Sequence, residues 1–92
     1  LPSRPVIVAP KNDVPAGSIT FTWEASSKGE GSIVYDLFIK HASDMGFGLL
    51  EEGISNTSHS ATLTAGTLSW YVQARDSRGQ LSQSAIISLS LN

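Results

Sequence analysis

One stretch of sequence decides the fold: Leu68-Ser69-Trp70-Tyr71-Val72-Gln73-Ala74-Arg75-Asp76, with Ser77-Arg78-Gly79 directly after it. Within it, four apolar residues alternate with mostly polar ones: Leu68, Trp70, Val72 and Ala74. Successive strand residues point to opposite faces of a sheet, so one face of this segment is apolar. The aspartate and glycine that follow have the chemistry of a tight turn. The stretch therefore predicts a central strand that leads into a hairpin.

Composition limits the classes of partner. The chain has 92 residues, of which 40% are hydrophobic and 15% charged, with a formal net charge of −2. This length suits a single domain. Because there is no run of Lys or Arg, the electrostatic signature of nucleic-acid binding is missing. No apolar run approaches the ~20 residues that a membrane span needs. We expect neither a nucleic-acid partner nor membrane insertion.

The N-terminal residues indicate a chain excised from a longer protein. The sequence starts with Leu1-Pro2-Ser3-Arg4 rather than methionine, and these residues lack the apolar core of a signal peptide. We interpret residues 1–4 as the remnant of an interdomain linker stiffened by proline, and residues 5–92 as one domain. Cysteine is absent, which removes disulfides, thiolate metal sites and cysteine nucleophiles.

Short alternating segments joined by turns account for the rest of the chain. Strands are predicted at residues 5–10, 18–24, 33–40, 49–52, 55–63, 68–76 and 81–91. In the last of these, alternation places Ala85, Ile87, Leu89 and Leu91 inward and Ser84, Ser88 and Ser90 outward. Without helical crossovers the strands must pair antiparallel. The predicted fold class is all-β, a seven-stranded antiparallel β-sandwich, in which Trp23 and Trp70 meet from opposite sheets.

These segments resemble a fibronectin type III domain of the bacterial style, within the immunoglobulin-like superfold. The similarity covers nearly the whole chain, and its strongest part is residues 70–79, which are similar to the family's sixth strand and the hairpin into the seventh. Other matching segments are residues 5–10, Trp23, residues 35–39 and Leu63. The family usually has a tyrosine early in the sixth strand, where this chain has Leu68. Immunoglobulin domains proper are a poorer match, because their cysteine pair is missing.

No catalytic or metal-binding pattern stands out, and we expect a protein that is not an enzyme and needs no cofactor. Arg78-Gly79-Gln80 lacks the carboxylate of an integrin-binding Arg-Gly-Asp motif and is interpreted as a plain turn. His41 and His59 are too few for a catalytic zinc site, which needs about three protein ligands. The spacing of the acidic candidates does not suit calcium; they are Asp13, Asp44, Glu51 and Glu52. The serines form no hydrolase motif, and Asn56-Thr57-Ser58 is only a formal glycosylation acceptor.

The one candidate site is an aromatic patch. Phe38 and Tyr71 both fall on the outward register of their strands, which are neighbours in a type III arrangement. They are expected to form an exposed interaction surface with Val34 and Ile86. Three occupants are considered: a neighbouring domain or plain cross-strand packing, a partner protein, and a glycan stacked on the rings.

The resemblance implies an accessory or spacer module of a larger extracellular or cell-surface protein. Carbohydrate-active enzymes and adhesins are common parents of such modules, so the expected partners are the neighbouring domains of the parent protein. The alternatives are a carbohydrate-binding module that stacks sugars on Phe38 and Tyr71, and an adhesion module with a protein partner.

Overall fold

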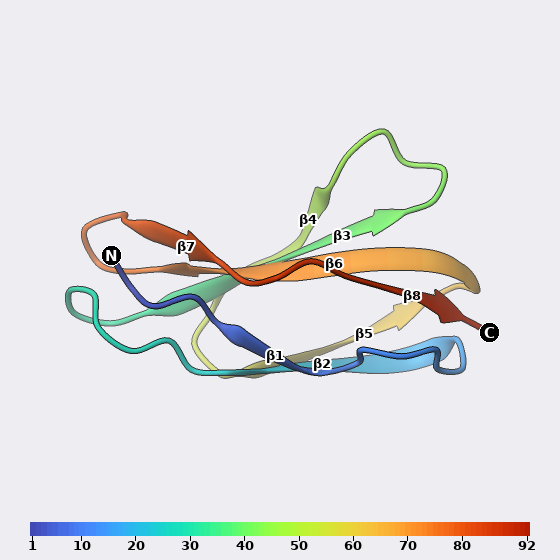
Figure 1. Ribbon diagram of the computed structural model, residues 1–92, viewed down its shortest axis with the longest axis horizontal. Coiled ribbons are helices and arrows are strands. Elements are labelled where there is room, and N and C mark those ends of the chain that lie inside the picture. The colour runs from blue at the N-terminus through green and yellow to red at the C-terminus, as the bar shows by residue number, and fades with distance from the viewer.

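The computed structural model describes residues 1–92 and contains eight β-strands in two antiparallel sheets. One sheet has the order β1-β2-β5, with β1 at Val6–Ala9, β2 at Gly17–Glu24 and β5 at Ser58–Leu63. The other has the order β4-β3-β6-β7, and β8 also pairs with β6. Its strands are β3 at Val34–His41, β4 at Gly48–Ile54, β6 at Gly66–Arg75, β7 at Leu81–Gln83 and β8 at Ile87–Leu91. Figure 1 shows the two sheets stacked as layers, which confirms the predicted β-sandwich.

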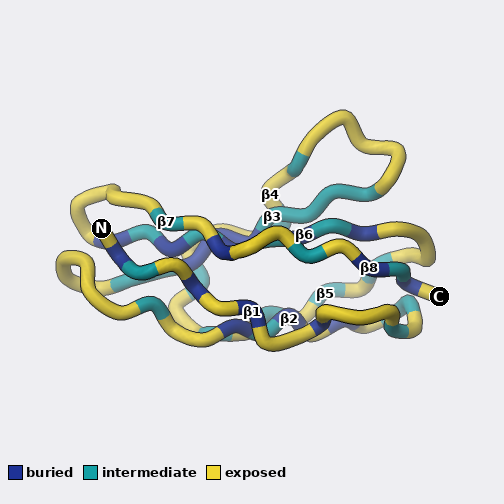
Figure 2. The backbone as a smooth tube through the Cα atoms, viewed as in Figure 1, coloured by how far each residue is buried: buried dark blue, intermediate teal, exposed yellow.

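The central strand is the one that the sequence predicts. Every inward residue of β6 (Leu68, Trp70, Val72 and Ala74) has no exposed surface. Figure 2 shows buried residues interspersed along the strands of both layers, with exposed residues in the loops. The opposite sheet contributes Ile19, Phe21 and Trp23 from β2, which are at most 5% exposed. Alternation in the two strands therefore builds the core from both sides.

The two tryptophans do not pair with each other, contrary to the sequence-based expectation. Trp70 instead meets Phe21 edge to face, with ring centroids 4.8 Å apart. Trp23 meets Tyr35 in the same manner at 5.6 Å. Each tryptophan thus packs against a smaller ring of the opposite sheet, a geometry that the quadrupoles of aromatic rings favour.

The predicted last strand is interrupted, and this is why there are eight strands rather than seven. Gln83 of β7 pairs with Gln73 of β6, and Ile87 of β8 pairs with Trp70 of β6. Between these two pairs, the segment that joins β7 to β8 contains one more residue than the facing part of β6. This extra residue makes a β-bulge. It turns Ser84 inward, where it is 1% exposed, and leaves Ala85 exposed. The predicted orientations of these two residues were therefore wrong.

Ser84 replaces a backbone partner that the bulge removes. Its Oγ accepts a hydrogen bond from the buried N–H of Val72 at 2.9 Å and donates one to the carbonyl of Ala85 at 2.9 Å. A buried N–H group without a partner is costly, so a hydroxyl is needed at this inward position.

We predict that Ser84→Ala lowers the free energy of unfolding by about 1–3 kcal/mol, because it leaves the N–H of Val72 buried and unpaired. Ser88→Ala is the matched control: its hydroxyl bonds only Ser69 on the exposed face, so its effect should stay within about 0.5 kcal/mol. Urea denaturation followed by tryptophan fluorescence measures both. Equal losses in the two variants would show that the Ser84 hydroxyl has no special role.

Candidate functional site

Phe38 and Tyr71 lie side by side on the outer face of the larger sheet. They are directly opposite each other in the β3–β6 register. Their ring centroids are 4.9 Å apart and their planes differ by 9°, so the rings are stacked face to face. Both side chains are half-buried. Each ring therefore has one face covered by the other.

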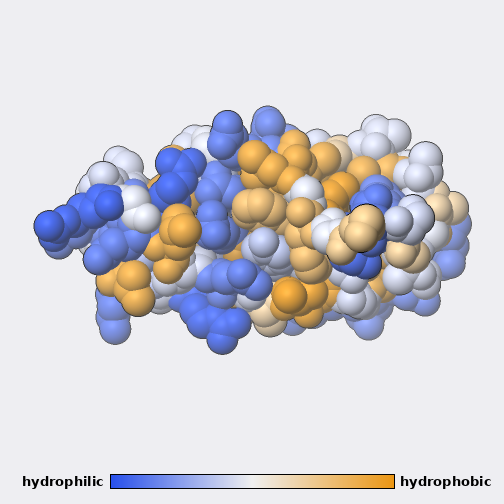
Figure 3. Space-filling model, turned by 90° about the horizontal axis from the view of Figure 1, so that it is seen from above, coloured by the Kyte–Doolittle hydropathy of each residue, from blue (hydrophilic) through white to orange (hydrophobic).

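Two exposed aliphatic residues extend this pair into a row across the sheet. Leu49 of β4 lies opposite Phe38. Ile86 precedes Ile87, which pairs with Trp70, so the register places Ile86 beside Tyr71. Leu49 is 49% exposed and Ile86 51%. We call Leu49, Phe38, Tyr71 and Ile86 the outer row. In Figure 3, which views this face from above, hydrophobic atoms gather near the middle with hydrophilic atoms around them.

A third ring comes from the loop between β3 and β4. Phe47 meets Tyr71 at a centroid distance of 4.9 Å and an interplanar angle of 72°. Burial by these neighbours raises the pKa of the Tyr71 phenol above its ordinary value. The sequence did not indicate Phe47 or Leu49 as members of the site. Phe47 lies between Gly46 and Gly48 in an irregular loop, where no periodicity predicts which way a side chain points.

Val34 is separated from the other three predicted residues. It lies on the same face of β3 as Phe38, with Asp36 between them, and it is opposite Arg75. Asp36 accepts hydrogen bonds from Arg75 Nη2 at 3.1 Å, Arg75 Nε at 3.3 Å and Gln73 Nε2 at 3.2 Å. The backbone N–H of Gly53 donates a further bond at 3.0 Å. A polar cluster thus interrupts the apolar patch that the sequence predicts.

Opposing effects set the pKa of Asp36. Its burial alone would raise the pKa, but the hydrogen bonds from Arg75, Gly53 and Gln73 and the charge of Arg75 hold it below the ordinary value. The carboxylate is therefore ionised at neutral pH and forms a two-pronged ion pair with the guanidinium.

A carboxylate with a lowered pKa stabilises the fold above the ordinary pKa of about 4, and this contribution is lost as the pH falls through the lower, folded value. We predict that Asp36→Asn costs about 1 kcal/mol at pH 7, because Arg75 is partly in water. In this variant the free energy of unfolding should also fall less steeply than in the native protein as the pH is lowered from about 5 to about 2. Urea denaturation across this pH range is the measurement, with the exposed Glu51→Gln as control. An unchanged pH slope in Asp36→Asn would contradict the assignment.

Residues 76–79 form the turn that the sequence predicts, closed by a hydrogen bond from Gly79 N–H to the Asp76 carbonyl at 3.0 Å, and Gln80 follows it. The Asp76 carboxylate accepts hydrogen bonds from the N–H groups of Arg78 at 3.0 Å and Gln80 at 2.9 Å, and from Glu30 N–H at 3.1 Å. Burial would raise the pKa of Asp76, but these bonds hold it below the ordinary value. Gly79 has a φ of 80°, which few other residues adopt. Asp76 thus ties the β6–β7 turn to the loop after β2.

The two histidines lie on different sheets, and only His41 has a carboxylate beside it. His41 Nδ1 is 3.6 Å from Asp44 Oδ2, whereas His59 lies on β5 in the other sheet. Asp13 accepts a bond from the N–H of Ser90 at 2.9 Å. No three His, Cys, Asp or Glu side chains converge as metal ligands would.

The groove beside His41 is lined by His41, Ser43 and Asp44 together with residues 64–67. No hydroxyl makes a hydrogen bond to the His41 ring, and its buried Nε2 has no partner. A Ser–His–Asp relay requires a bond between nucleophile and base, so this cluster does not have the geometry of a hydrolase. The structure also contains no helix long and apolar enough to cross a membrane.

Comparison with known proteins finds similarity in structure only. No protein-family model and no curated protein sequence matches the chain. A fibronectin type III-like protein from Clostridium thermocellum superposes with a TM-score of 0.73 at 19% identity, covering 99% of this chain and 94% of that one. The fibronectin type III domain of human fibronectin type III domain containing protein 3 gives 0.70 at 17%, covering 99% and 84%. A β-1,2-glucanase from Parabacteroides distasonis gives 0.73 at 15%, covering 99% of this chain but 13% of the enzyme.

Proposed function

Since the chain has the fibronectin type III fold, we propose that it is a non-catalytic module that spaces and orients neighbouring domains in a larger extracellular or cell-surface protein. The glucanase comparison supports a modular role, because there the same fold occupies a small part of a longer chain. The surface is consistent with the proposed location: it has few charges and many serine and threonine hydroxyls.

The position of the two termini carries this proposal. The molecule measures 39 × 24 × 18 Å, and its termini lie toward opposite ends of the long axis (Figure 1). Domains joined to the two ends would therefore be held in line on either side of it. A module whose termini lay together would instead place its neighbours side by side.

Both ends of the chain are also fixed to the sandwich. Residues 1–4, which the sequence assigned to a linker, contact the domain: Ser3 N–H bonds the Ser27 carbonyl at 2.7 Å, and Arg4 Nε bonds the Gln83 carbonyl at 2.7 Å. At the other end, Asn92 N–H bonds the Val14 carbonyl at 2.9 Å. Fixed ends transmit the orientation of the domain to what is attached, as a spacer requires.

The spacer proposal predicts a narrow distribution of end-to-end distances. The chain has no cysteine, so Leu1→Cys and Asn92→Cys together give one spin-label pair, and double electron–electron resonance measures its distances. A single narrow peak is expected in the native protein, and a broad distribution in urea. A broad distribution under native conditions would show that the ends move freely and would overturn the spacer role.

Glycan binding is the alternative that the aromatic rings suggest, but their geometry is unfavourable for it. Sugar rings stack on a free aromatic face, whereas Phe38 and Tyr71 cover each other and Leu49 lies on the far side of Phe38. Adhesion or packing against a neighbouring domain needs only the exposed ring edges and the aliphatic ends of the outer row.

We therefore expect no saturable change in fluorescence when the isolated domain is titrated with a panel of plant and bacterial polysaccharides. Tyr71→Ala should leave that result unchanged, with Tyr35→Phe as a control in the buried core. A saturable response that Tyr71→Ala abolishes would replace the spacer role with a carbohydrate-binding role.

A further inference from the structure

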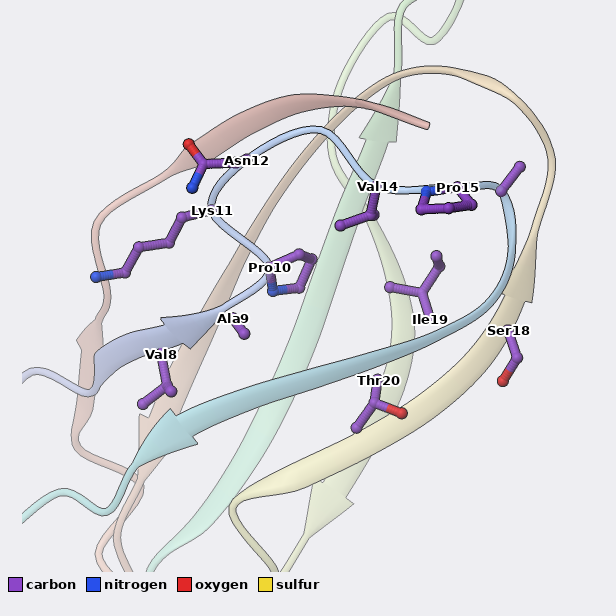
Figure 4. A pocket seen from close by; sticks show the side chains of 11 residues that line it. Val8, Ala9, Pro10, Lys11, Asn12, Val14, Pro15, Ser18, Ile19 and Thr20 are labelled. Carbon is purple, nitrogen blue, oxygen red and sulfur yellow. The ribbon is translucent and has the colours of Figure 1, made fainter. Parts of the chain in front are cut away.

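A groove of about 530 Å³ lies where β1 ends and β2 begins. It is lined by Val8, Ala9, Pro10, Lys11, Asn12, Val14, Pro15, Ala16, Ser18, Ile19 and Thr20. In Figure 4 the Val14 and Ile19 side chains point toward each other across it, while Lys11 extends outward from the end next to β1. The volume is within the usual range of ligand sites, and most of the side chains around it are small or apolar.

The groove exists because β1 ends before it has paired with the whole length of β2. The last pair between β1 and β2 is Ala9 with Thr22. The chain then crosses to the other sheet, where Val14 N–H bonds the Ser90 carbonyl at 3.1 Å. Trp70 Nε1 donates to the Pro10 carbonyl at 3.1 Å at the start of this crossing. Residues 17–21 of β2 consequently have β5 on one side and no strand on the other.

Unpaired backbone groups of β2 face this open side. Along an antiparallel strand, the N–H and C=O groups of successive residues point to alternate edges. Trp23 N–H bonds Thr57 on the β5 side at 3.0 Å, so the odd-numbered residues of β2 point that way. The even-numbered residues point to the β1 side, where Thr22 meets Ala9. Thr20 and Ser18 have no opposite residue there, and both line the groove.

The unpaired backbone groups and the charge beside the groove indicate what kind of molecule would bind there. Alternating N–H and C=O groups along a strand edge are matched by another extended backbone. The free part of β2, about three residues at ~3.3 Å each, accommodates about 10 Å of added strand. Lys11 is the one charged residue among those that line the groove, and its ammonium is carried on a flexible stem at the end next to β1. A complementary occupant carries a carboxylate at that end.

We propose that this groove binds a short extended peptide as an added strand along Ser18–Thr20, with apolar side chains against Val14 and Ile19 and an acidic residue beside Lys11. This site is separate from the outer row, which lies on the other sheet. The proposal therefore does not depend on the spacer role.

The test uses a synthetic pentapeptide that begins with N-acetylated aspartate and continues with alternating valine and threonine. An added strand that pairs antiparallel with β2, as β1 does, has its amino end beside Lys11. The peptide is titrated into the 15N-labelled domain and followed by NMR. We expect saturable shifts of the Ser18 and Thr20 amide signals and slower hydrogen exchange at these two amides. The same peptide with N-methylated amides cannot pair with a strand and should bind at least tenfold more weakly. This comparison leaves the protein unaltered, so it does not depend on a variant that folds.

Charge reversal tests the acidic end of the peptide. Lys11→Glu should weaken binding of the peptide that begins with aspartate several-fold and favour a counterpart that begins with N-acetylated lysine. Lys40→Glu, on the other sheet, is the matched control and should change neither. The proposal is overturned if no amide signal shifts at millimolar peptide, or if the shifted signals belong only to the free edges of β4 or β5. It is also overturned if the N-methylated peptide binds as tightly as the unmodified one. The Ser18 and Thr20 amide signals could also shift with protein concentration in the absence of peptide. That result would show that a second copy of the chain occupies the groove, and it would overturn the peptide proposal.

Discussion

The burial of Trp70 is the constraint on which the rest of the structure depends. Its ring fills the space between the sheets against Phe21, and its one polar atom must find an acceptor because no water reaches it. The Pro10 carbonyl meets this need at 3.1 Å. One side chain of the central strand thereby packs the core and also fixes the point at which the N-terminal segment passes from one sheet to the other.

That passage also shapes the surface of the smaller sheet. Because the chain crosses at Pro10, β2 keeps an open edge and a groove beside it. On the larger sheet, the outward residues of β3 and β6 form a stacked pair and a polar cluster rather than one apolar surface. On neither face do three His, Cys, Asp or Glu side chains converge as metal ligands would.

Residues that follow strict alternation were predictable from the sequence, and residues whose position depends on register or distant contacts were not. Alternation places Trp70 and Phe21 inward without ambiguity. Ser84 violates the same rule, because a hydroxyl in a strand normally faces solvent and only the bulge turns it inward. Phe47 reaches Tyr71 because the β3–β4 hairpin loop brings it there, and the groove requires Val14 to find Ser90 near the other end of the chain. No local pattern encodes such contacts.

The pairing of residues 14–16 with residues 90–92 has a consequence for biosynthesis. These hydrogen bonds join a segment near the start of the domain to its last strand, so the first of the two is synthesised well before the second. The early segment cannot take its final place until the C-terminal strand has emerged, so the sandwich closes only after nearly all of it has been translated. Val6, Val8 and the open edge of β2 are accessible during this interval and stay so in the folded domain. The prolines on both sides of β1 discourage this edge from pairing with other nascent chains.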